Sequence, residues 1–399
     1  MLPKSVRLFL RAAPVAATRN GGGLRSVLIY QFDERRFTEL TGVVFIDASE
    51  LGDLLPLAGA AFRTGAEARS QTGEPDAPER GDSQSLQSFT YPFVLARGPS
   101  GARISKPPTY DRDVSRYTLL HEYAGNRFLQ YGMFDSLSGT PGSFWAYRRL
   151  NAPADISMIN WPGNDVCDPG YLSTDPLNAA RALQHGKQVS LGFAWWIAQQ
   201  APEMTLRKNV LGTDDGLSQY PYIRESRRLE ALRVVREQDI ADPTSPDARA
   251  APFGDSAGIG LYPIDIHGCG KPQRLPATKP FQIPFGALLS RDVHNLLAGG
   301  KNIGATHIAN GAYRLHPTEW AIGEAAGTLA AEAVRLKRTP AALYRDAAAL
   351  RRVQRKLIES GHPLVWFDDI APGDPSFVEA QWTGLTQPHT LNSGSLHRK

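Results

Sequence analysis

The chain has 399 residues, of which 42% are hydrophobic, so it can bury a large core and its length allows two or three domains. Its 44 basic and 40 acidic residues leave a formal charge of only +4, which argues against nucleic acid as a partner. The two cysteines, Cys167 and Cys269, are too few for a disulfide framework, and no apolar run reaches the roughly 20 residues that span a bilayer. We therefore expect a globular cytoplasmic protein with no signal peptide and no membrane span.

The first part of the chain is predicted to be a β-hairpin or meander. Strands are expected at residues 6–10 and 26–30, on either side of the turn signal NGGG at residues 20–23, because Asn-Gly tolerates positive φ. Residues 41–48 predict a buried strand, since β-branched residues cluster there and polar ones follow. The carboxyl end of such a strand is where an α/β sheet holds a ligand.

The middle of the chain mixes irregular segments with strands and one long helix. Residues 65–88 are rich in Gly, Pro and polar residues without a period, which is typical of an irregular segment. Strands are expected at residues 88–95 and 144–150, and a helix at residues 176–201, whose tryptophans should pack in the core. A second, amphipathic helix is predicted over residues 222–238, because apolar residues recur there at helical spacing.

The most informative segment is an apolar strand near residues 293–298 that leads through small residues into a long helix beginning near Pro317. Small residues at a strand's end let the backbone approach a ligand closely. The first N–H groups of the helix and its dipole favour an electron-rich or anionic group. Glycine and alanine at i, i+3, i+4 and i+7 predict a helix face that packs tightly on a sheet: Gly323, Ala326, Gly327 and Ala330.

This segment resembles a known flavin-binding motif. Residues 295–327 (NLLAGGKNIGATHIANGAYRLHPTEWAIGEAAG) are similar to the C-terminal motif of the FAD-dependent oxidoreductase family, which is related to glutathione reductase folds. Three shorter matches occur in the family's chain order, at residues 46–54 (IDASELGDL), 222–228 (YIRESRR) and 262–267 (YPIDIH). The resemblance covers residues 6–334. It implies an α/β fold with a partial FAD-binding Rossmann-like domain of the glutathione reductase type and a β-rich substrate domain.

The same resemblance implies a domain layout. Residues 1–65 and 221–340 would belong to the FAD-binding domain. Residues 66–220 would form the substrate or cap domain, and residues 341–399 a C-terminal helical extension and tail.

The resemblance also implies which residues lie beside FAD. Ala48 and Ser49 match the family's strand-end motif, whereas Glu50 stands where the wider family has glycine. The loop that approaches the ribityl and pyrophosphate groups is matched by Gly299, Gly300, Lys301 and Asn302. The helix entrance near the isoalloxazine ring is matched by Arg314, Pro317 and Thr318.

One part of the family's pattern has no match in this sequence. The family opens with a strand, a G-x-G-x-x-G turn and a helix that hold the FAD pyrophosphate and adenosine. The glycines at residues 21–23 are followed by a strand pattern instead, so we interpret them as a hairpin turn. We expect the chain to start midway through the family's fold.

The catalytic candidates are weaker than the cofactor residues. His307, Arg314 and His316 surround the presumed flavin loop, and either histidine could orient a substrate, although histidines often only satisfy local hydrogen bonds. His267 and Cys269 lack the second pair of a zinc site, so no metal is expected. A structural ion-pair network that braces the domains is the favoured reading of the charged residues in the second motif: Arg224, Glu225, Arg227 and Arg228.

The sequence thus predicts an FAD-dependent oxidoreductase that transfers a hydride from a small organic substrate to flavin. The substrate cannot be identified from the sequence. The alternative is a truncated or partner-dependent homologue without catalysis that binds flavin weakly or not at all. A lyase or hydrolase is a third possibility, but no acid-base residues cluster in the sequence to support it.

Overall fold

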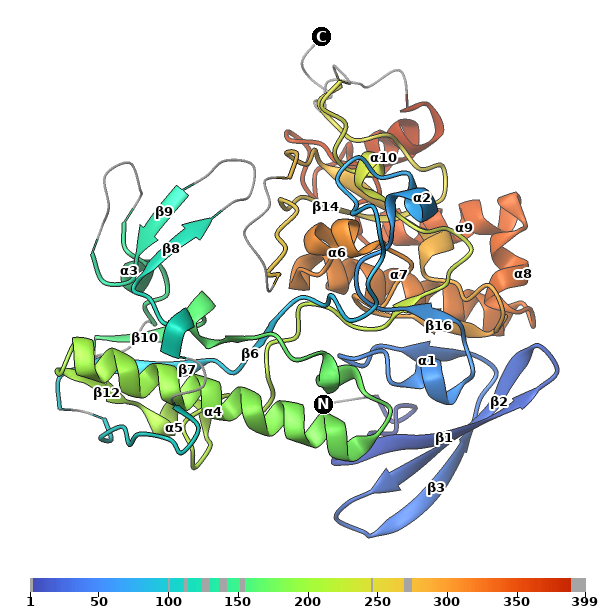
Figure 1. Ribbon diagram of the computed structural model, residues 1–399. Helices are drawn as coiled ribbons and strands as arrows, with labels where there is room; N and C mark the ends of the chain where they lie inside the picture. Colours follow the sequence, from blue (N-terminus) through green and yellow to red (C-terminus); the bar gives the residue numbers. More distant parts are fainter. Residues whose placement is uncertain are drawn as a thin grey trace. The chain divides into compact units, whose positions relative to one another are not determined.

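The computed structural model describes residues 3–99, 101–110, 114–123, 129–135, 142–150, 155–244, 247–268 and 275–388. The chain divides into two compact units (Figure 1). Unit 1 comprises Met1–Ser83, Glu225–Ile264 and Pro276–Lys399, and unit 2 comprises Gln84–Arg224 and Asp265–Leu275. Both units contain helices and strands, which confirms the predicted α/β class.

Unit 1 opens with an antiparallel meander, drawn in dark blue in Figure 1. Its strands are β1 (Ala12–Asn20), β2 (Gly23–Gln31) and β3 (Arg36–Thr41). Asn20 pairs with Gly23 and Gly21 has a φ of 59°, so the predicted hairpin turn is confirmed. The strand predicted at residues 6–10 is wrong: these residues are not in a strand, and Val6, Leu8 and Leu10 are exposed.

The predicted buried strand at residues 41–48 is also wrong in its extent. Thr41 ends β3, and only Phe45–Asp47 form a strand, β4, in which Ile46 remains 39% exposed. The buried strand is instead β16 (Leu296–Ala298), which pairs with β4 in parallel and places Leu297 opposite Ile46. β16 is therefore the strand that anchors this pair in the core.

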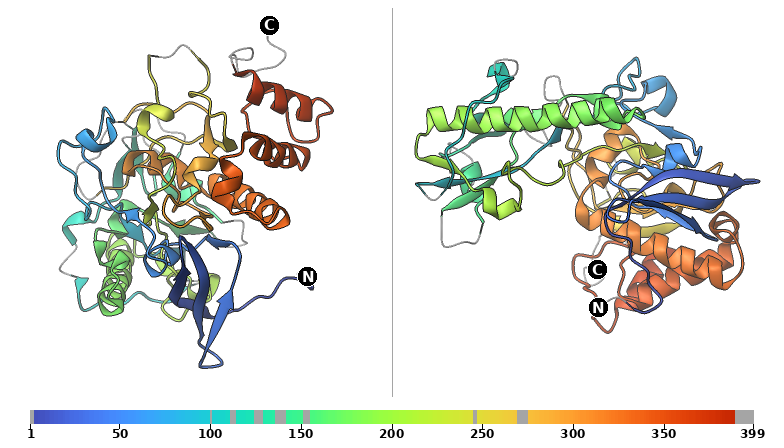
Figure 2. Two further views of the ribbon diagram at one scale, coloured as in Figure 1. Left: turned by 90° about the vertical axis from the view of Figure 1, so that its right-hand side faces the viewer. Right: turned by 90° about the horizontal axis from the view of Figure 1, so that it is seen from below.

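The last part of unit 1 is helical, as the orange and red ribbons in Figure 2 show. α7 packs on the antiparallel pair of β14 and β15 and on α8 and α9, and α10 packs on α9. The strands are β14 (Ser256–Gly260) and β15 (Phe281–Pro284). The helices are α6 (His307–Tyr313), α7 (His316–Arg335), α8 (Pro340–Tyr344), α9 (Ala347–Glu359) and α10 (Phe377–Thr386).

α7 begins close to the predicted Pro317, and its predicted packing face is correct in part: Ala326 is fully buried, whereas Gly327 is open. The helix buries the side that carries Ile322, Ala325 and Leu329, because these side chains remove more apolar area from water than glycine does. A Cβ at Gly327 would meet no atom within 4 Å. A Cβ at Gly323 would lie 3.5 Å from the carbonyl oxygen of Gly299, in ordinary contact, so the predicted face is open at Gly327 and not along its whole length.

The helix predicted over residues 222–238 does not form. Arg228–Leu229 are strand β13, paired with β5 (Phe62–Arg63), and Glu237–Asp239 form a single 3₁₀ turn. Glu225 and Arg228 are fully buried, so the charged positions do not lie on a solvated helix face. Two short helices complete the early part of the unit: α1 (Leu54–Leu57) and α2 (Arg69–Thr72).

Unit 2 is built on an antiparallel sheet in which β7 (Phe93–Arg97) lies between β10 (Ile156–Ile159) and β12 (Met204–Leu206). The long helix α4 (Pro176–Gln200), green in Figure 1, confirms the helix predicted there. Trp195 and Trp196 are half-buried in a group of aromatic rings; Trp195 lies 4.6 Å from Tyr110 between ring centroids. The remaining strands are β6 (Phe89–Thr90), β8 (Leu120–Tyr123), β9 (Leu129–Gly132) and β11 (Asp165–Val166).

The strand predicted at residues 144–150 is wrong. Phe144–Tyr147 form helix α3, which Ser143 begins by accepting a hydrogen bond from the backbone N–H of Ala146 at 3.3 Å. A capping residue therefore outweighs the strand preference of the aromatic residues. The other helix of this unit is α5 (Lys208–Leu211).

Cys167 in unit 2 is disulfide-bonded. Disulfide bonds are uncommon in reducing compartments. The low cysteine count is therefore no argument that this protein belongs to a reducing compartment. In the described part of the chain, no helix is both long enough and apolar enough to cross a membrane.

Two glycine substitutions test this packing. Gly163→Ala should destabilise unit 2 by about 1–3 kcal/mol, because its Cβ would lie 2.4 Å from the ring of Phe193 in α4. Gly327→Ala, in the open side of α7, should stabilise unit 1 by about 0.5–1 kcal/mol through helix propensity. Differential scanning calorimetry measures both; equal effects of the two substitutions would contradict the packing described.

Candidate functional site

The carboxyl ends of β4 and β16 lie side by side, because the two strands are parallel. Asp47 forms hydrogen bonds with both of the loops that follow these two strands. Its carboxylate accepts hydrogen bonds from the N–H groups of Ser49 and Leu54, both at 3.0 Å, and its carbonyl oxygen accepts from Gly299 N–H at 2.8 Å and from the Asn302 amide at 2.9 Å. Asp47 was not predicted as a site residue, although it ends the motif strand.

Lys301 is buried at this edge, with only 3% of its surface exposed. Its ammonium group forms ion pairs with Glu50 and, at 3.6 Å, with Glu319 in the first turn of α7. The Glu319 carboxylate also accepts a hydrogen bond from the Lys301 N–H at 3.0 Å. In the loop that follows β4, the residue with a left-handed backbone conformation is Gly52, whose φ is 64°. The backbone at residue 50 therefore does not require glycine, and Glu50 can occupy the position where the wider family has one. Glu50 instead neutralises a buried lysine.

The junction between α6 and α7 leads into the start of the longer helix. Arg314, the C-cap of α6, is 4% exposed, and Thr318 is buried, whereas His316 and Pro317 are exposed. The N-cap of α7 is Leu315, whose hydrocarbon side chain cannot accept a hydrogen bond. No side chain caps the helix, so its first-turn N–H groups suit an acceptor from a ligand.

His307, the first residue of α6, belongs to a buried cluster of charges. Its Nδ1 lies 2.9 Å and 3.1 Å from the two carboxylate oxygens of Glu225, which is fully buried. The Nε of Arg228 lies 3.2 Å from the same carboxylate. The side chain of His307 is 11% exposed. The imidazole is therefore held by a buried carboxylate rather than by solvent.

The same cluster fixes the start of α6. Glu67 accepts a hydrogen bond from the His307 N–H at 2.9 Å and from the Arg228 guanidinium at 2.6 Å. Arg228 also donates to the carbonyl oxygen of Ala305 at 2.8 Å. The Thr306 hydroxyl begins the helix by accepting a hydrogen bond from Ala309 N–H at 3.1 Å. Buried acidic groups thus lie at the positive end of α6.

A further carboxyl group, that of Glu74, accepts hydrogen bonds from the Thr306 hydroxyl and, at 2.8 Å, from the backbone N–H of Glu237. Both glutamates are 1% exposed. Burial raises the pKa of Glu74, and burial together with the side chain of Asp76 raises the pKa of Glu237 to about 7. The N-cap of α6 therefore rests on carboxyl groups that hold protons more tightly than in the unfolded chain.

The charged residues of the second motif form the predicted ion pairs. In unit 1, Arg228 pairs with Glu67 and Glu225, and Arg227 pairs with Asp53 at 3.3 Å. In unit 2, Arg224 lies 3.1 Å from Asp165 and donates to the Thr90 hydroxyl at 2.8 Å. His267 lies between two carboxylates of unit 2, at 3.0 Å from Asp165 and 3.3 Å from Asp265.

His267 and Cys269 are the two residues that the sequence offers as possible metal ligands. Cys269 lies outside the described residues. Among the residues that are described, no group of three or more His, Cys, Asp or Glu side chains has an arrangement that could hold a metal ion.

Comparison with known families identifies the class of protein. Residues 1–357 match the family model described as FAD dependent oxidoreductase. The chain belongs to this family, and its cofactor is FAD. No curated protein and no solved structure matches the chain significantly.

The described residues fit the ring end of this cofactor better than its diphosphate. The uncapped start of α7 suits the electron-rich N1/C2 edge of an isoalloxazine ring. The loop after β16 offers little to phosphate. Its N–H groups at Gly299, Gly300 and Lys301 already donate to acceptors of the chain itself, and two carboxylates neutralise the Lys301 ammonium.

The structure brings most of the predicted cofactor residues to one place. Ala48, Ser49 and the loop from Gly299 to Asn302 lie at the shared edge of β4 and β16, and Glu319 joins them from α7. His307 belongs to a different set of contacts, the Glu225 cluster at the start of α6. Sequence reasoning missed Glu67, Glu74 and Glu237, because nothing in their local sequence marks them as buried.

A double-mutant cycle tests the Lys301 ion pair. Glu50→Gln and Lys301→Met should show a coupling energy of about 1–3 kcal/mol in the free energy of unfolding of unit 1, because Lys301 is buried and Glu50 is one of its two partners. Chemical denaturation of the four proteins gives the value. Additive effects would show that Glu50 does not compensate the buried ammonium.

The raised pKa of Glu237 predicts how stability depends on pH. The folded state binds this proton more tightly than the unfolded state, so unit 1 should lose stability as the pH rises from about 4.5 to about 7. Glu237→Gln should remove this loss and stabilise the unit by about 1–3 kcal/mol at pH 8, after allowance for solvent screening. Thermal melts of wild type and variant between pH 4.5 and 8 measure it. Parallel pH profiles would contradict the assignment.

Proposed function

We propose that this protein uses FAD to oxidise a small organic substrate, with His307 as the group that takes up the substrate's proton. The observation that carries the proposal is the buried pair of His307 and Glu225, in which Nδ1 contacts both carboxylate oxygens. The family match over residues 1–357 supports flavin redox chemistry over the non-catalytic alternative. The proposal includes the prediction that the FAD-binding domain is Rossmann-like and of the glutathione reductase type.

The Glu225 contact decides which nitrogen of His307 is reactive. An ionised carboxylate only accepts hydrogen bonds, so Nδ1 carries the proton and Nε2 keeps its lone pair. Within the described residues, no group forms a hydrogen bond with Nε2. A neutral imidazole in this tautomer accepts a proton at Nε2 while Glu225 stabilises the cation that forms.

The charges of the cluster favour that step. Counted over Glu67, Glu225, Arg228 and a neutral His307 alone, two carboxylates and one guanidinium leave one negative charge, while Arg63 and Glu74 also interact with Glu67 from outside this group. A proton on His307 brings the cluster to zero. Because the cluster is almost fully buried, this compensation acts in a medium of low dielectric constant.

The reaction balances with these groups. Bound FAD supplies a two-electron acceptor for the hydride of a substrate C–H bond. The proton of the adjacent O–H or N–H group passes to Nε2 of His307. We assign the ring end of the cofactor to the start of α7 and to the edge that carries Ala48 and Ser49. Arg314, next to that start, is assigned to the ring end as well.

A comparison of two histidines tests the proposal. FAD-loaded protein is mixed anaerobically with small alcohols and amines, and bleaching of the oxidised flavin band identifies a substrate. His307→Gln should then slow bleaching by about 10²–10⁴-fold with unchanged FAD affinity, whereas Glu225→Gln should slow it less and alter its pH profile. The exposed His316, the other candidate, provides the matched variant.

The outcomes separate the two roles. Near-normal bleaching in His316→Gln, with slow bleaching in His307→Gln, supports His307 as the proton acceptor. If His307→Gln reduces the flavin at the wild-type rate, or if only His316→Gln is slow, the assignment is wrong. A chain that stays colourless after incubation with FAD would contradict the flavin function itself.

A further inference from the structure

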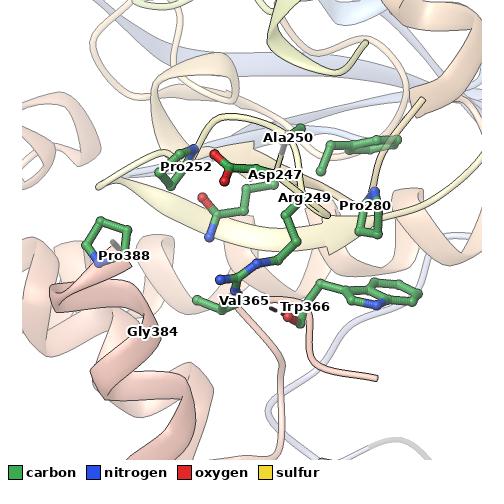
Figure 3. Close-up of a pocket in the computed structure, with 11 residues that line it drawn as sticks. Asp247, Arg249, Ala250, Pro252, Pro280, Val365, Trp366, Gly384 and Pro388 are labelled. Atoms are coloured by element: carbon green, nitrogen blue, oxygen red, sulfur yellow. Dashed lines mark hydrogen bonds between the residues drawn. The ribbon is translucent and has the colours of Figure 1, made fainter. Parts of the chain in front are cut away.

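Unit 1 contains a cavity that is separate from the residues assigned to the flavin. It has a volume of about 70 Å³ and lies between the loop before β14, the start of β15 and the segment around α10 (Figure 3). A buried water needs roughly 15 Å³ by this measure, so the cavity has room for the head of a small ligand. The residues that matter for its chemistry are Asp247, Arg249, Pro252, Pro280, Gln282 and Trp366.

Arg249 supplies the positive charge of this cavity. Its side chain reaches across to the backbone of Trp366, where Nη1 donates to the carbonyl oxygen at 3.3 Å (Figure 3). The guanidinium also lies 5.6 Å from the centroid of the Phe367 ring. In the part of the chain that is described, Arg249 forms no ion pair within 4.0 Å, and burial lowers the pKa of its guanidinium. Most of its N–H donors are thus available to an anion.

The other polar groups narrow the kind of anion. The Gln282 side chain is fully used, since it accepts from Phe253 N–H at 2.5 Å and donates to the carbonyl oxygen of Leu364 at 2.8 Å. Asp247 lines the same cavity, and its negative charge disfavours a doubly charged ligand. One guanidinium therefore remains to bind the anion, and its planar fork matches a carboxylate.

The walls of the cavity suit an apolar ligand body. Pro252 and Pro280 line it as rigid, largely apolar groups, and the half-buried Trp366 adds an aromatic surface. From the Arg249 guanidinium, the neighbouring Asp247 and these walls, we propose that the cavity is a binding site for small apolar monocarboxylates, with the carboxylate on Arg249.

Isothermal titration calorimetry on the FAD-loaded full chain tests this site with benzoate as the probe. Benzamide is the uncharged control, and inorganic phosphate tests the other oxyanion class. Benzoate should bind, benzamide and phosphate should bind at least 10-fold more weakly, and Arg249→Met should weaken benzoate binding at least 10-fold. Arg249→Lys should recover little, because an ammonium cannot form the bidentate contact. The exposed Arg25→Met is the matched control and should bind like wild type.

The flavin spectrum separates this site from the flavin site. Benzoate bound at Arg249 should leave the visible spectrum unchanged, and Arg249→Met should keep the wild-type melting temperature and flavin spectrum. Wild-type benzoate affinity in Arg249→Met, equal affinity for benzamide, stronger binding of phosphate, or no binding of benzoate at millimolar concentration would each overturn the proposal. These results leave the function of His307 untouched, because that function is read from flavin bleaching.

Discussion

The guanidinium of Arg228 is the interaction on which the proposed site depends. It is 1% exposed, and a buried charge is tolerated only when it is paired and hydrogen-bonded. Nη1 of Arg228 donates to Glu67 and to the carbonyl oxygen of Ala305, whereas its Nε forms an ion pair with Glu225 without a hydrogen bond. These partners come from three parts of the chain that are far apart in sequence. Loss of the guanidinium would leave two buried carboxylates facing each other.

The orientation of His307 follows from this constraint. Arg228 fixes the Glu225 and Glu67 carboxylates, Glu225 holds the imidazole, and Glu67 holds the backbone of the same residue. The nitrogen that the proposal makes reactive is therefore oriented by buried charges. The shared edge of β4 and β16 uses the same principle, since Glu50 and Glu319 pair with the buried Lys301. Both halves of the site are organised by compensated charge.

The sequence predicts those parts of the fold that local patterns determine. The NGGG turn, the helix α4 and the start of α7 near Pro317 follow from turn chemistry, helical period and proline at a first turn. Residues 222–238 were wrongly predicted as a helix, because apolar residues recur there at helical spacing although the segment forms strand β13 and irregular structure. Their partners Glu67 and His307 are distant in sequence, and this pairing overrides the local pattern. The small-residue face of α7 was predicted to pack along its whole length but is open at Gly327, because a small residue fits a packed position and an open one equally well.

The resemblance predicts which residues lie beside the cofactor, but it does not predict the contacts that these residues make in the structure. The departure at Glu50 is explained only by Lys301, 251 positions away in the sequence. The cluster around His307 likewise depends on Glu67, whose own segment reads as irregular. Long-range pairs of this kind carry no local signature.

A crystal structure of the chain with bound FAD tests the central claim most directly. The account predicts that the N1/C2 edge of the isoalloxazine ring lies at the start of α7, within hydrogen-bond distance of the Thr318 N–H, and that Nε2 of His307 opens onto the space beside the ring. A flavin bound away from α7, or a His307 whose Nε2 is bonded to the protein and closed off from the ring, would contradict it.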